Sequence, residues 1–155
     1  MDAVHPRVLA YLGRALSLEL SAVQQYITHA SLLDVWGDSA SADRFRHETV
    51  EEMKHAESIV QRMLRLGVAP AASQLKPVTH APDLVGLLLR NSELEQELID
   101  HYAEATRFCV LIRDADNQPF FEALWRDEQH HGADLARWLA ELGAQPRVLA
   151  ERAVF

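Results

Sequence analysis

The 155-residue sequence has a single cysteine, Cys109, and it lacks the long apolar run that a membrane span needs. One thiol cannot form a disulfide within the chain, and sparse cysteine is typical of proteins in a reducing compartment. A transmembrane helix needs ~20 consecutive apolar residues, so we expect no membrane partner. Residues 1–6 also lack the basic and apolar regions of a signal peptide. We therefore expect a cytoplasmic protein.

Positive charge is scarce relative to negative charge. The sequence has 15 Lys and Arg residues against 23 Asp and Glu residues, which gives a formal net charge of −8. An acidic surface repels the phosphates of nucleic acids, so we expect no nucleic-acid partner. Hydrophobic residues make up 48% of the chain and charged residues 25%, which is typical of a folded domain. The length predicts one domain, 1–155, whose core needs no disulfide.

Signals for β-strands are weak, whereas helical periodicity is strong. No run combines β-branched residues, strict alternation and hairpin turns. Apolar residues recur at spacings of three and four, the pattern of amphipathic helices, and proline and glycine mark the breaks. The predicted helices cover about residues 6–36, 41–66, 82–114 and 119–142, with a long crossover at 68–81 and a short tail or fifth helix at 145–155. This pattern predicts an all-α, four-helix bundle with one crossover.

The two halves of the chain repeat one polar pattern at an offset of 76 residues. Several polar matches at a single offset are hard to obtain by chance, so we interpret the repeat as functional. The matched pairs are Glu19 with Glu95, Tyr26 with Tyr102, Glu52 with Glu128, His55 with His131, and Leu66-Gly67 with Leu142-Gly143.

The repeat is expected to gather four carboxylates and two imidazoles inside the bundle. In each Glu-x-x-His motif the two side chains share a helix face, while Glu19 and Glu95 lie within apolar stripes that contain no Lys or Arg. Buried ionised carboxylates are very costly unless they are paired or bind metal. Two divalent cations would neutralise four carboxylates, and this mixed oxygen and nitrogen set suits iron or manganese.

These motifs resemble those of bacterioferritin, in the ferritin-like di-iron family. The resemblance is carried by residues 18–26, 52–56, 94–97 and 126–131, and it spans about residues 4–143. It implies a ferritin-like bundle and a homo-oligomer, from a dimer to a 24-subunit cage. It also implies that two irons are bound by Glu19, Glu52, His55, Glu95, Glu128 and His131, with Glu52 and Glu128 bridging.

The resemblance implies further roles, each with a structural alternative. Tyr26, and Tyr102 as its counterpart, would donate hydrogen bonds to ligand carboxylates, or simply fill the core. Met53 matches the methionine that binds haem b across a subunit dyad, or is a flexible packing residue. It lies about 100° around the helix from its neighbouring ligand, so it should leave the metal face. His47 and Glu51 match an inner-surface iron site, or form a solvated charged face.

The implied function is iron storage with ferroxidase activity, in which Fe(II) is oxidised to Fe(III) by O2 or peroxide. A rubrerythrin-like peroxidase is the first alternative, but its rubredoxin-type iron site needs four thiolates and the chain has one. A small-molecule oxygenase usually needs a larger chain, and miniferritins place their ligands between subunits. A structural or haem-carrying cage subunit without turnover is a further alternative.

Two features depart from the bacterioferritin pattern. The tail after residue 145 is short where bacterioferritins carry a fifth helix, so the size of the assembly stays open. Gln129-His130 replaces the usual acidic-glycine pair between the last two ligands.

Overall fold

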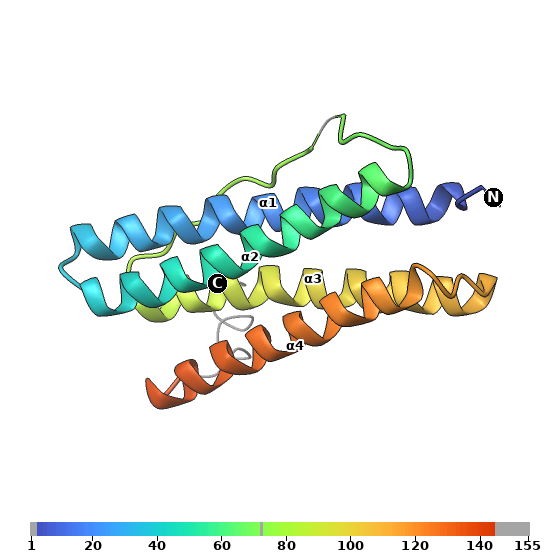
Figure 1. The fold of residues 1–155 in the computed structure, drawn as a ribbon. Coiled ribbons are helices and arrows are strands. Elements are labelled where there is room, and N and C mark those ends of the chain that lie inside the picture. Colours follow the sequence, from blue (N-terminus) through green and yellow to red (C-terminus); the bar gives the residue numbers. More distant parts are fainter. Residues whose placement is uncertain (1–2, 72, 145–155) are drawn as a thin grey trace.

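The computed structural model describes residues 3–71 and 73–144, and most of these residues lie in four long helices (Figure 1). They are α1 (Pro6–Val35), α2 (Ser39–Arg65), α3 (Leu84–Ile112) and α4 (Gln118–Glu141). Each predicted boundary lies within two residues of the observed one, and the predicted all-α four-helix fold is confirmed. The predicted tail or fifth helix at 145–155 lies outside the described residues.

Local sequence sets where the helices begin and end. The side chain of Asp38 accepts a hydrogen bond from the Ser41 N–H at the start of α2, and Asp83 does the same for Gly86 at the start of α3. Such caps satisfy N–H groups that have no partner within the helix. Gly67 follows α2 with a φ of 78°, a left-handed conformation that glycine adopts without steric penalty.

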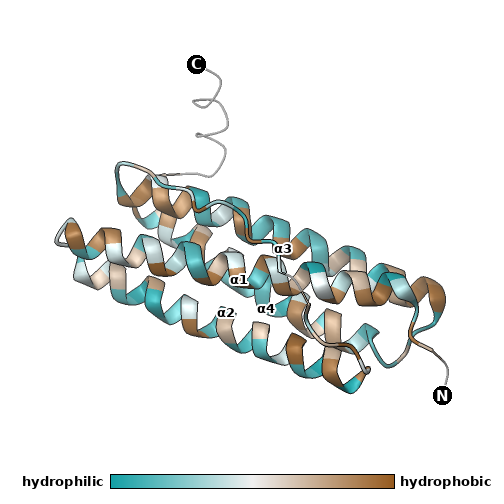
Figure 2. Cartoon of the chain, turned by 90° about the horizontal axis from the view of Figure 1, so that it is seen from above, coloured by the Kyte–Doolittle hydropathy of each residue, from teal (hydrophilic) through white to brown (hydrophobic). Residues whose placement is uncertain are grey.

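The helices form two antiparallel pairs. α1 packs against α2, α3 packs against α4, and the pairs meet mainly through α1 and α3 (Figure 1). Hydrophobic and hydrophilic bands alternate along every helix, as the sequence periodicity predicts (Figure 2). Among the described residues, no helix is both long and apolar enough to cross a membrane.

The apolar core consists of two clusters that occupy different lengths of the bundle. The larger contains Leu12, Ile59 and Phe121, and the smaller contains Phe45 and Leu139. On α2, α3 and α4 the predicted glutamate ligand lies near the change from one cluster to the other, whereas Glu19 of α1 lies within the larger cluster. The apolar packing therefore fixes the helices on both sides of the polar centre.

A row of polar side chains on α1 holds the crossover that leads from α2 to α3. The row members are four residues apart, so they share one face of the helix. They satisfy backbone groups of the extended segment, which would otherwise lack partners against the bundle. Gln74 N–H donates to Ser17 Oγ at 3.0 Å, Lys76 N–H donates to Ser21 Oγ at 2.9 Å, Thr79 Oγ1 donates to Gln25 Oε1 at 2.8 Å, and His29 Nε2 lies 2.6 Å from Thr79 O.

Candidate metal centre

The four predicted glutamate ligands lie at mid-bundle, one on each helix. The exposed fraction is 0% for Glu19, Glu52 and Glu128, and 1% for Glu95. Each helix contributes its glutamate from the side that faces the bundle interior, which is the side that the apolar periodicity defines. Four carboxylates from distant parts of the chain are therefore enclosed together away from bulk water.

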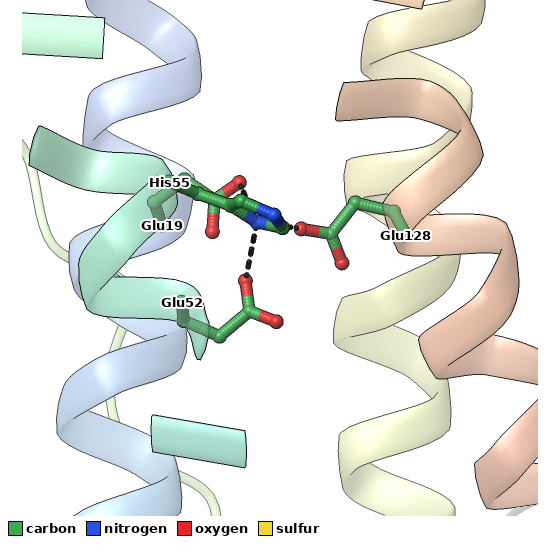
Figure 3. A group of neighbouring side chains, drawn as sticks. All are labelled: Glu19, Glu52, His55 and Glu128. Atoms are coloured by element: carbon green, nitrogen blue, oxygen red, sulfur yellow. Dashed lines mark hydrogen bonds and ion pairs between the residues drawn. The ribbon is translucent and has the colours of Figure 1, made fainter. Parts of the chain in front are cut away.

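One group of ligands surrounds the imidazole of His55. Its Nδ1 lies 2.8 Å from Glu128 Oε1, 3.4 Å from Glu19 Oε1 and 3.5 Å from Glu52 Oε2. Figure 3 shows the ring between these three carboxylates, which come from three different helices. One ligand atom from each of the four residues lies within 4.8 Å of the others, so a single cation could contact them all.

A second group surrounds His131 and shares two carboxylates with the first. Its Nδ1 lies 2.7 Å from Glu52 Oε1 and 3.4 Å from Glu128 Oε2, and Glu95 completes the group. Glu52 and Glu128 belong to both groups, whereas Glu19 and Glu95 each belong to one. This arrangement can hold two adjacent cations with two shared carboxylates. The 76-residue repeat relates the ligands of one cation position to those of the other.

Two buried tyrosines hold the unshared carboxylates. Tyr102 Oη donates to Glu19 Oε1 at 2.6 Å, and Tyr26 Oη donates to Glu95 Oε1. Burial, followed by the charge of the bonded glutamate, raises the pKa of each tyrosine well above its usual value. Both hydroxyls therefore stay protonated as donors. Each tyrosine contacts the glutamate of the other half of the chain, so the two halves are interlocked.

The electrostatics of the centre favour added positive charge. Among the described residues, these glutamates form ion pairs with the two histidines and with no lysine or arginine. Burial raises the pKa of Glu19, Glu52 and Glu95. Burial also opposes the charge of His131, but hydrogen bonding to the buried glutamates outweighs it and raises the pKa of His131 to about 11.

Several carboxylate oxygens in this centre have no hydrogen-bond donor. A buried acceptor left without a donor destabilises a fold by about 1–3 kcal/mol. A metal ion would satisfy these atoms, so the donor set fits the cation pair that the motifs predict. These oxygens are Glu19 Oε2, Glu52 Oε2, Glu95 Oε2 and Glu128 Oε2, whereas Glu52 Oε1 contacts His131 Nδ1.

Two acidic residues near the centre were not among the predicted site residues. Asp127 Oδ2 lies 3.1 Å from His55 Nε2, so it can orient the ring with Nδ1 toward the carboxylates. Glu48 Oε2 lies 3.9 Å from His131 Nδ1. The repeat offered a signal for Asp127, because it is the counterpart of Glu51 at the same offset. For Glu48 the available signal was its position one helical turn before Glu52, which places both side chains on one face of the helix.

The remaining predicted site residues lie outside the centre. The Met53 side chain points away from it and is 55% exposed. Together with Leu20, it lines a cavity of about 750 Å³ between α1 and α2. His47 lines a separate cavity between α2 and α4, while Glu51 pairs with Lys54 at 3.1 Å. Within the described residues, no hydrogen bond or ion pair joins His47 to Glu51.

Comparisons with known proteins agree with this arrangement. The ferritin-like domain model matches residues 9–144. The bacterioferritin of Rhodobacter capsulatus is 33% identical over 125 residues, which cover 81% of this chain and 78% of that protein. This chain belongs to the bacterioferritins of the ferritin-like family. A bacterial ferritin of Neisseria gonorrhoeae is 30% identical over 134 residues, covering 86% of this chain and 84% of that protein.

The bacterioferritin fold extends over nearly the whole described chain. The Rhodobacter capsulatus bacterioferritin structure has a TM-score of 0.85 at 30% identity, and it covers 90% of this chain and 87% of that chain. That protein has a dinuclear site, metal-free in that structure, and haem iron in a crystallographic special position. The family resemblance inferred from the ligand motifs is thus confirmed for this bacterioferritin chain.

Proposed function

We propose that this bacterioferritin binds two Fe(II) ions at the Glu19, Glu52, His55, Glu95, Glu128 and His131 centre and oxidises them for storage as Fe(III). The observation that carries the proposal is the sharing of Glu52 and Glu128 by two ligand groups, in a site with unpartnered buried oxygens. Two divalent ions would neutralise the four carboxylates. The dinuclear site of the Rhodobacter capsulatus relative supports the same function.

The iron ions are the substrate, and each gives up one electron. With O2 as the oxidant, two electrons and two protons yield hydrogen peroxide. With hydrogen peroxide, two electrons and two protons yield two water molecules. The protein's part is to hold the two ions side by side, neutralise their charge and exclude bulk water.

The residues around the ligands prepare them for metal. Asp127 accepts a hydrogen bond from the Nε2–H of His55, which leaves Nδ1 directed at the ion position. Tyr102 and Tyr26 fix the orientation of the two unshared carboxylates. Because nearby carboxylates stabilise imidazolium in the metal-free centre, each histidine must lose a proton before it binds an ion.

The proposal includes a homodimer that binds haem b through Met53. An exposed methionine in a cavity lined by Leu16, Leu20 and Val60 offers a thioether and an apolar wall to a porphyrin. The haem iron of the relative occupies a crystallographic special position, which is a position shared by symmetry-related copies. A Soret band that is present in the wild type and absent in Met53→Leu would support this assignment. An unchanged band would contradict it.

Ferroxidase activity is tested by adding Fe(II) to the metal-free protein and recording O2 consumption and the absorbance of Fe(III). We expect rapid uptake by the wild type and loss of that phase in Glu19→Ala, His131→Ala and Glu128→Gln. Glu122→Gln is the matched control, because Glu122 lies on the same helix and pairs with Arg126 on the surface. No uptake by the wild type would instead favour a structural or haem-carrying subunit.

The inner-surface iron site at His47 and Glu51 stays a prediction, as do the size of the cage and the cytoplasmic location. His47 shares its cavity of about 450 Å³ with Glu48 and Asp134, so cations can approach this face. Iron titration of His47→Ala, with the ferroxidase phase as an internal reference, tests that site.

A further inference from the structure

A groove between α3 and α4 reaches the metal centre. These helices lie side by side along the bundle (Figure 1), and a groove of about 660 Å³ lies between them. Its lining includes Glu95, which is otherwise buried and whose Oε2 has no hydrogen-bond partner. The groove therefore leads from the surface to a carboxylate of the His131 ligand group.

The 76-residue repeat explains why this groove is open at the metal centre. Six of the ten groove residues have their counterparts in the lining of the cavity between α1 and α2, but Glu19, the counterpart of Glu95, is not part of that lining. The α3–α4 groove has smaller or more polar side chains at these positions. The counterpart pairs are Leu20 with Gln96, Met53 with Gln129, Ala56 with Gly132, and Val60 with Ala136.

Gly132 lies where the groove has least room for a side chain. A Cβ added there would lie 3.1 Å from Ile99 Cδ1, so any side chain would reduce the space beside Glu95. Glycine within a helix is about 1 kcal/mol less favourable than alanine. The glycine in the middle of α4 therefore makes the helix less stable, but it keeps the groove open beside Glu95.

The side chains that line the groove suit an uncharged small molecule. Ser92, Gln96 and Gln129 offer hydrogen bonds without charge, while Ile99 and the alanines add apolar wall. The ionisable lining residues, Glu93 and Glu95, are both acidic and repel anions. The cavity between α2 and α4 differs in that it carries charges of both signs, with Arg44 and Arg137 beside its four acidic residues.

We propose that the α3–α4 groove admits the uncharged oxidant, O2 or hydrogen peroxide, to the Glu95 side of the metal centre. This inference rests on the proposed ferroxidase function and adds the route to it.

The test narrows the groove without touching a ligand. Gly132→Val fills the space against Ile99, and Ala136→Met covers the groove from an exposed position on the same helix. Ala140→Met is the matched control, because Ala140 is exposed one turn further along α4 and does not line the groove. The probe is nitric oxide, an uncharged diatomic, mixed anaerobically with the Fe(II)-loaded protein in a stopped-flow spectrometer.

We expect nitric oxide to bind roughly tenfold more slowly in both groove variants and at the wild-type rate in Ala140→Met, a change of ~1.4 kcal/mol in the barrier. Titration with Co(II) should give two ions per chain in all four proteins. Wild-type nitric oxide rates in Ala136→Met would overturn the proposal, even if Gly132→Val fails to fold. Slower Co(II) binding with unchanged nitric oxide rates would also overturn it. If the wild type itself fails to bind two Co(II) ions, the proposed function fails instead.

Discussion

The three tyrosines of this bacterioferritin allow a comparison of how much a hydrogen bond to glutamate contributes to stability inside the metal centre and outside it. Each donates a hydrogen bond between α1 and α3 to a glutamate that is distant in the sequence. Tyr102 and Glu19 are both 0% exposed, whereas Glu104, the partner of Tyr11, has a side chain that is 52% exposed. Changing a tyrosine to phenylalanine removes one hydroxyl group. In Tyr102 that group is shielded from water, whereas in Tyr11 it bonds a carboxylate that water can reach.

The expected magnitudes follow from what replaces the lost hydrogen bond. In Tyr102→Phe no water replaces the hydroxyl, so Glu19 keeps an unsatisfied oxygen and the metal-free protein should lose about 1–3 kcal/mol of its free energy of unfolding. For a chain of this length that corresponds to a fall in melting temperature of roughly 2–12 °C. In Tyr11→Phe water can hydrate Glu104, and the loss should be about 0.5 kcal/mol.

Metal affinity gives a second measurement of the same hydrogen bond. Loss of a partner that orients a ligand typically weakens metal binding by about 10–100-fold. Co(II) titration should therefore show one weakened position in Tyr102→Phe and one in Tyr26→Phe, with two intact positions in Tyr11→Phe. The reasoning is refuted if Tyr102→Phe melts at the same temperature as Tyr11→Phe and binds both ions as tightly as the wild type.

Three further predictions concern the loaded centre. Divalent metal should stabilise the bundle by ~2.7 kcal/mol per site at a free concentration 100 times the dissociation constant, seen as a higher melting temperature that chelation reverses. Metal binding should release protons, because the glutamates outweigh burial and raise the pKa of His131 to about 11, so imidazolium is present at neutral pH and must deprotonate. An indicator dye should report this release, affinity should fall as pH is lowered, and proton-neutral binding would contradict the pKa argument. Asp127→Asn should weaken one of the two ions by about tenfold in a Co(II) titration, and equal loss at both positions would contradict its contact with His55 alone.

The helices and the candidate ligands could be predicted because their signals are local in the chain. A spacing of three residues places Glu52 and His55 on one helix face, whatever the rest of the fold does. The periodicity of apolar residues marks the same helices that the structure contains. The repeat of 76 residues adds the second half of the ligand set, and the need to neutralise buried carboxylates predicts the cations.

Contacts between helices depended on the packing of the whole core. Tyr26 lies seven residues after Glu19 on the same helix, yet its hydroxyl bonds Glu95 on α3. Asp127 reaches His55 across the bundle, and the opening beside Glu95 depends on how closely α3 approaches α4 at Gly132. Rotation and axial offset of each helix decide such pairings, and they result from the fit of many side chains at once. The spacing of residues along one helix therefore does not predict which side chains meet across two helices.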